Sequence, residues 1–215
     1  MEIRWLADRS FIISTATGTL VTDPLAGSSP GSELDPGSVV ATASHAAATR
    51  GIDEWREKTH VIDGPGEYEI SGLGVRGIAT SMADVNDPRA LNTVFILDAE
   101  LISVCHLGAL AAPLTTQAAQ LIGHVDVLIT PAGGMDQAIS ADQAAAVTRV
   151  LEPRLIIPIH PGVLPGDPVY TSLAAYVAEV GLPMPEPVSR ITVTRSNIGE
   201  VQRLVVLRPL GAESY

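Results

Sequence analysis

The chain has 215 residues, of which 46% are hydrophobic, 17% charged and 4% aromatic, a composition typical of a globular protein rather than a disordered or fibrous one. Thirteen basic side chains against 24 acidic ones give a formal net charge of -11, which argues against nucleic acid as a partner because a phosphate backbone would be repelled. The single cysteine excludes a disulfide framework, and the lack of a signal peptide or of an apolar run near the roughly 20 residues of a membrane helix predicts a single cytoplasmic domain, residues 1–215, with no membrane partner.

The first half of the chain is predicted to be mainly β. Short extended pieces from Ile3 to Thr22 indicate an N-terminal meander, because β-branched residues and Phe11 favour strands. A loop rich in Gly, Ser and Pro follows from Asp23-Pro24 to Pro36-Gly37. Further strands are predicted at residues 39–42, at 68–70 and 73–75 as a hairpin across Ser71-Gly72, and at 92–97 and 101–105.

The second half alternates between helices and strands. Helices are predicted at residues 115–122, 140–151 and 172–180, and strands at 125–130, 155–159, 190–195 and 201–207. Ser140 and Gln143 form the pattern of a capping box, and Pro153 ends that helix. Strands that alternate with helices indicate crossover connections. Two sheets covered by outer helices satisfy the pattern, and a doubly wound sheet or an α+β domain remains an alternative.

Six phrases of the sequence follow one another along the chain: GPGEYE at 64–69, NTV at 92–94, CHLG at 105–108, PAGG at 131–134, LEP at 151–153 and IPIH at 157–160. Together they resemble the metallo-β-lactamase superfamily, and in particular its branch of small bacterial zinc-hydrolase-like proteins. The match runs from about Ile3 to His160. The resemblance implies an αββα sandwich, in which two mixed β-sheets are flanked by helices and loops from both sheets meet at a metal site on one edge.

The same resemblance implies a set of zinc ligands that this chain only partly retains. The family's His-x-His-x-Asp-His run corresponds to residues 45–50, where His45 is kept but Ala47, Thr49 and Arg50 replace the other ligands. The aspartate expected after Gly108 is Ala109. Zinc catalysis needs about three protein ligands and an open position for water. A degenerate metal site therefore follows, with His45 and His160 as relic ligands.

The candidate pocket residues are Asp8, Asp23, His45, Arg50, His106 and His160. Because a guanidinium stays protonated at any accessible pH, we expect Arg50 to replace the lost metal charge and to pair with Asp8 or Asp23. Glu67 and Glu69 alternate along a strand and are expected to be solvated. Cys105 ends an apolar run and is expected to be buried rather than nucleophilic.

The sequence thus predicts a metallo-β-lactamase-like pseudoenzyme without a cofactor, which acts as a scaffold or binds a small molecule or a protein, a second copy of itself included. The alternative is a metal-dependent hydrolase, with zinc, of an ester, lactone or phosphoester, built around His45, His106 and His160. The number of plausible metal ligands separates the two hypotheses, and this sequence supplies few.

Overall fold

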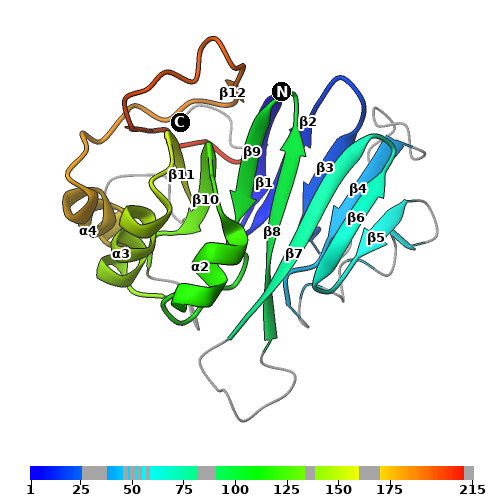
Figure 1. Ribbon diagram of the computed structural model, residues 1–215. Helices are drawn as coiled ribbons and strands as arrows, with labels where there is room; N and C mark the ends of the chain where they lie inside the picture. The colour runs from blue at the N-terminus through cyan, green and yellow to red at the C-terminus, as the bar shows by residue number, and fades with distance from the viewer. Residues whose placement is uncertain are drawn as a thin grey trace.

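A computed structural model describes residues 1–25, 38–45, 48, 52, 55–56, 59–81, 91–133, 139–159 and 170–210. Within them the strands form two sheets (Figure 1). The first has the order β12-β1-β2-β3-β4-β5. Its strands are β1 (Glu2–Ala7), β2 (Ser10–Ser14), β3 (Thr19–Thr22), β4 (Val39–Thr42), β5 (His60–Ile62) and β12 (Ile191–Thr192). The strands β1, β2 and β3 pair antiparallel as the predicted meander, and β3, β4 and β5 pair parallel.

The second sheet has the order β13-β11-β10-β9-β8-β7-β6. The predicted hairpin is present, since β6 pairs antiparallel with β7 and both Ser71 and Gly72 have positive φ angles in the turn between them. The strands β9, β10, β11 and β13 pair parallel, so the sheet is mixed. Its strands are β6 (Gly66–Ile70), β7 (Leu73–Ser81), β8 (Leu91–Ala99), β9 (Ile102–His106), β10 (Val127–Pro131), β11 (Leu155–Ile159) and β13 (Arg203–Leu204).

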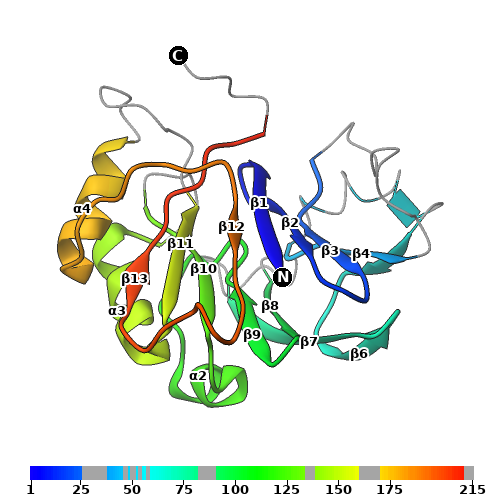
Figure 2. The ribbon, with the colours of Figure 1, turned by 90° about the horizontal axis from the view of Figure 1, so that it is seen from above.

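In the described part of the chain, three helices cover the outer face of the second sheet: α2 (Thr116–Ile122), α3 (Ala141–Leu151) and α4 (Tyr170–Val180). Seen from above, they lie on the side of this sheet that faces away from β1 and β2 (Figure 2). The predicted capping box starts α3, and a hydrogen bond of 2.8 Å between the buried Thr148 and Tyr176 hydroxyls joins α3 to α4. None of the helices in the described part of the chain is both long and apolar enough to cross a membrane.

The apolar side chains separate into layers that follow the alternation of the strands. In β9, Ile102 and Val104 belong to the core between the two sheets, whereas Cys105 belongs to the core under the helices. A third, smaller core lies on the outer face of the first sheet around Val21 and Trp55. The αββα sandwich expected from the sequence is therefore confirmed, and the doubly wound and α+β alternatives are wrong.

The two C-terminal strands predicted from the sequence are much shorter in the structure. Residues 190–195 and 201–207 contain only β12 and β13, two residues each, and these lie in different sheets. The side chain of Asn197 explains part of the shortening, because it accepts from the Thr194 N–H at 2.8 Å and donates to the Thr192 carbonyl at 3.0 Å. Both backbone groups are thus taken by a turn rather than by a neighbouring strand.

Candidate functional site

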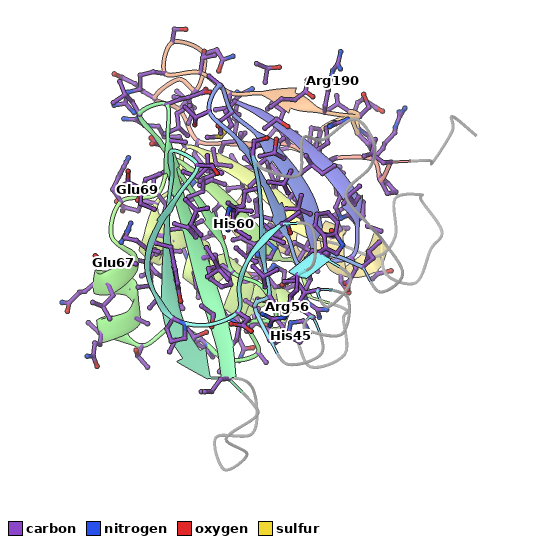
Figure 3. The ribbon with its side chains drawn as sticks, turned by 90° about the vertical axis from the view of Figure 1, so that its right-hand side faces the viewer. His45, Arg56, His60, Glu67, Glu69 and Arg190 are labelled. Carbon is purple, nitrogen blue, oxygen red and sulfur yellow. The ribbon has the colours of Figure 1, made fainter. Side chains whose placement is uncertain are left out.

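The ends of several strands meet at one edge of the sandwich. In the first sheet this edge holds the turn between β1 and β2 and the ends of β3 and β4, because β1, β3 and β4 run in the same direction. In the second sheet it holds the start of β8 and the end of β9, which are antiparallel. The Thr93 N–H donates to the Ser44 carbonyl at 2.7 Å and joins the two sheets there. His45 lies near this edge, at the other end of the molecule from Arg190 (Figure 3).

A hydrogen-bonded chain of three side chains forms the centre of this edge. Asp23, which follows β3, is buried and has a φ of 38°. Its Oδ1 accepts from the Ser44 N–H and its Oδ2 from the Ser44 hydroxyl, both at 2.6 Å. The Ser44 Oγ lies 3.0 Å from Nδ1 of His45. The order Asp23–Ser44–His45 therefore connects a buried carboxylate to a partly exposed imidazole.

The proton positions in this chain follow from the donor inventory. An ionised carboxylate can only accept, so the one Ser44 hydroxyl proton points to Asp23. The Ser44 oxygen must then accept from Nδ1–H of His45, which leaves the lone pair of the ring on Nε2. Ser44 is 2% exposed, so its hydroxyl cannot reach a substrate as a nucleophile.

Burial shifts the pKa values of both ends of the chain. Loss of solvent raises the pKa of Asp23 from 3.8 to about 6, because its bonds to Ser44 and the Arg9 charge only partly offset the cost of burying its charge. Burial, and then the Arg9 charge, lower the pKa of His45 from 6.5 to about 4. His45 is therefore a neutral imidazole at pH 7, and its low pKa makes it a weak general base.

Arg9 places a permanent positive charge at the edge. It lies in the turn between β1 and β2, its side chain is 13% exposed, and its Nη1 lies 3.2 Å from the Asp8 carboxylate. Besides acting on Asp23 and His45, its charge lowers the pKa of His106. The Trp5 indole donates to the Asp8 carbonyl at 2.8 Å and holds this turn, in which Asp8 has a φ of 47°.

His106 ends β9 and faces the core between the sheets, two residues after Val104. Its ring meets that of Phe11 edge-on, with 6.1 Å between centroids. It is 1% exposed, and burial, followed by the charge of Arg9, lowers its pKa to about 3. Neither ring nitrogen makes a hydrogen bond of normal geometry to a described residue, although the backbone of Arg9 lies near enough to favour the protonated ring slightly.

The residues after His106 pack tightly against the hydrogen-bonded series Asp23–Ser44–His45. Gly108 has a φ of 61°, and a Cβ there would lie 2.4 Å from Cβ of Ser44. Asn92 fixes the same backbone, since its amide donates to the Leu107 carbonyl at 2.9 Å and accepts from the Ala109 N–H at 2.8 Å. The Gly108 backbone therefore lies directly against the Ser44 side chain.

The described residues do not fit a catalytic zinc ion. Zinc requires about three donors around one point, and no group of three His, Cys, Asp or Glu side chains with that arrangement occurs among the residues that the structure describes. The Asp23 oxygens are engaged by Ser44, and Ala109 offers no donor. The guanidinium of Arg9 adds a positive charge that opposes a second cation.

The structure brings together four of the six residues that the sequence singles out. Asp8, Asp23, His45 and His106 belong to this edge, whereas Arg50 and His160 lie outside the described residues, so the expectations for these two stay predictions. Sequence reasoning missed Arg9, Ser44 and Asn92. Arg9 carried a findable signal, since it is a cation next to the candidate pocket residue Asp8 in the sequence. As expected, Glu67 and Glu69 are exposed, and Cys105 is buried with a raised pKa.

Residues 2–160 match a family model described as the beta-lactamase superfamily domain. The chain belongs to the metallo-β-lactamase superfamily. Its fold resembles that of a candidate Zn-dependent hydrolase of this superfamily from Thermotoga maritima, with 25% identity and a TM-score of 0.70 over 96% of this chain and 97% of that one.

Two other solved structures share the fold of this superfamily member at lower identity. The metallo-β-lactamase fold protein YhfI from Bacillus subtilis is 9% identical, with a TM-score of 0.59 over 97% and 96% of the two chains. Igni18, a metallo hydrolase from Ignicoccus hospitalis, is 16% identical, with a TM-score of 0.52 over 74% and 81%. Among curated proteins, none matches the chain in sequence.

Proposed function

We propose that this protein is a pseudoenzyme of the metallo-β-lactamase superfamily, which binds a small molecule at the sandwich edge without a catalytic metal ion. The observation that carries the proposal is the position of Arg9, whose charge acts on Asp23, His45 and His106 together. A permanent cation at this point supplies the positive charge that a metal ion provides in a zinc hydrolase.

The electrostatics of the edge support a binding role over hydrolysis. A general base works best with a pKa near the operating pH, whereas His45 has a pKa of about 4. The hydroxyl of Ser44 is buried. Neither a water-activating base nor an accessible nucleophile is therefore present among these residues, while a cation and polar groups suited to holding a ligand are.

The test combines metal analysis with activity. We expect protein purified without chelators to contain far less than one zinc, manganese or iron per chain by mass spectrometry, and added zinc to leave the melting temperature unchanged. We also expect no turnover of a chromogenic ester, a lactone or a phosphodiester. Stoichiometric metal together with metal-dependent turnover would overturn the proposal.

A metal-dependent hydrolase is the second candidate, because Nε2 of His45 has a free lone pair and the relative from Thermotoga maritima is itself a candidate Zn-dependent hydrolase. This function needs His45, His106 and His160 to converge on one ion. His45→Ala distinguishes the two functions, since it abolishes metal binding in the hydrolase and leaves metal content unchanged in the pseudoenzyme.

A further inference from the structure

Three buried polar side chains at the sandwich edge have unused hydrogen-bonding capacity. They are the Arg9 Nε, the Thr42 hydroxyl and both ring nitrogens of His106, none of which has a normal hydrogen bond to a described residue. Leaving a buried polar group without a hydrogen bond destabilises the fold, and a native protein keeps few such groups. Several at one place therefore call for a polar group from outside the chain.

The three side chains belong to one neighbourhood. The Thr22 hydroxyl donates to the Arg9 carbonyl at 2.8 Å, and Thr22 is the register partner of Thr42 in the next strand. Thr22 and Thr42 come two residues after Leu20 and Val40, which belong to the core between the sheets. Because side chains two residues apart in a strand share a face, both threonines face this core. His106 faces the same core from the opposite sheet, where its ring contacts Phe11.

The existing partner of Arg9 is a weak one. Both oxygens of Asp8 approach the same nitrogen, Nη1, at 3.2 and 3.4 Å, so the pair lacks the two parallel bonds of a fork-to-fork contact. The Asp8 side chain is 48% exposed, and it can turn into water at little cost. A carboxylate that approached Arg9 with better geometry would displace it.

The charges at the edge select a ligand with one negative charge. Arg9 is the described cation whose charge acts on Asp23, His45 and His106, whereas Arg56 is paired with Asp63, which directly follows β5 at the same edge. Both histidines are neutral at pH 7 because their pKa values are lowered. Asp23 is a nearby buried acid. Any anion would meet the positive charge of Arg9 and the negative charge of Asp23, and the repulsion from Asp23 is larger for a dianion such as phosphate than for a monocarboxylate, which Arg9 alone can pair.

We propose that this edge binds the carboxylate of a small organic acid, with Arg9 as its anchor in place of Asp8 and with Thr42 and His106 as further hydrogen-bond donors. This inference rests on the proposed function, because it requires an edge that binds without a metal ion. It goes beyond that function by naming the class of ligand and the residue that recognises it.

The test measures binding of acetate, lactate and benzoate to the wild-type chain by calorimetry and by NMR shift changes, at constant ionic strength, with inorganic phosphate as the dianion. We expect saturable binding of at least one monocarboxylate at millimolar affinity, about 4 kcal/mol, and weaker binding of phosphate. Arg9→Lys keeps the positive charge but cannot donate the two parallel hydrogen bonds of a guanidinium to a carboxylate, and we expect at least tenfold weaker binding. Arg190→Met, which removes an exposed arginine near Glu2, should bind as the wild type does.

Each outcome decides the inference. Equal binding by the wild type and Arg9→Lys, preference for phosphate, or no binding to a folded and metal-free wild type overturns the carboxylate site while the proposed function stands. An ordered water alone against His106 and Thr42, in a crystal grown with the best monocarboxylate, also overturns it. Stoichiometric zinc in the same samples would instead contradict the proposed function. Because the wild-type measurement needs no variant, an unfolded Arg9→Lys would leave a valid test.

Discussion

Two buried carboxylates lie at opposite ends of the sandwich and have opposite surroundings. Asp126, just before β10, accepts from the Ser103 N–H and from the cationic groups of Arg154 and Arg195, at 3.0 to 3.3 Å, and it contacts His124 at 3.1 Å. Asp23, at the other end, accepts from the neutral backbone N–H and hydroxyl of Ser44, and no other donor to it occurs among the residues that the structure describes. Two buried acids of one fold thus meet positive charge in one case and neutral donors in the other.

This difference indicates which end is structural and which can respond to a ligand. The Asp126 cluster ties the start of β10 to β11 and to the C-terminal segment, and all of its partners are directed at one carboxylate. At the Asp23 end, burial disfavours the charged forms of the titratable side chains. It raises the pKa of Asp23 to about 6 and lowers the pKa of both nearby histidines. Such perturbed groups concentrate at functional sites.

The largest effect is expected from filling the space against Ser44. Gly108→Ala puts a Cβ 2.4 Å from that of Ser44 at a φ of 61°, so left-handed strain of about 1–2 kcal/mol adds to overpacking of about 1–3 kcal/mol. We expect a loss of about 4 kcal/mol in the free energy of unfolding, measured with urea. Gly181→Ala is the control, because it has a φ of 76° and nothing within 4 Å and should lose only the strain. Equal losses would show that Ser44 is not held by this contact.

Removing the acid at the structural end should have the next largest effect. Asp126→Ala leaves the Ser103 N–H unpaired and two arginines without their shared acceptor. Loss of one partner from a buried ion pair costs about 3–5 kcal/mol. Because Arg195 is largely exposed to water, we expect a loss near the lower end, about 3 kcal/mol in the free energy of unfolding. Asp98→Asn, which breaks a surface pair with Arg76, should cost less than about 1 kcal/mol. Similar losses in the two variants would contradict a structural role for the cluster.

Prediction from sequence succeeded where the signal is local and failed where it depends on contacts across the fold. The strand 39–42 and the cap at Ser140 were predictable, because alternation and capping are read from neighbouring residues. The importance of Asn92 was not, because its amide binds the backbone of residues 107 and 109 from another strand. Arg9 was overlooked since its charge matters only once β1, β4 and β9 are brought together.

The pH dependence of stability should separate the two acids further. The raised pKa of Asp23 means that the native state binds more protons than the unfolded state between about pH 4 and 6. Its contribution to the free energy of unfolding therefore falls as pH rises through this window, and it stays lost above it. We expect Asp23→Asn, compared with the wild type, to gain about 2 kcal/mol between pH 4 and pH 8. A constant difference across this range would contradict the raised pKa.

The two histidines act in the opposite direction but do not obscure this comparison. Their lowered pKa values make the native state bind fewer protons below pH 6.5, so stability is lost as the pH falls. Both are present in the wild type and in Asp23→Asn, and their contribution cancels in the difference. Urea titrations of the two proteins at five or so pH values, with the difference plotted against pH, make the check.

The smallest effect concerns a single proton and changes stability little. In the wild type, Oδ2 of Asp23 receives the Ser44 proton, so His45 must carry its proton on Nδ1. In Asp23→Asn the amide oxygen keeps the bond to the Ser44 N–H, so the amide NH₂ faces the hydroxyl and donates to it. The Ser44 proton is then free to point at His45, which becomes the Nε2–H tautomer. Nitrogen-15 NMR of the ring distinguishes the two forms. An Nε2–H ring already present in the wild type would show that the proton chain does not begin at Asp23, and the two buried acids would then differ in their partners but not in what they control.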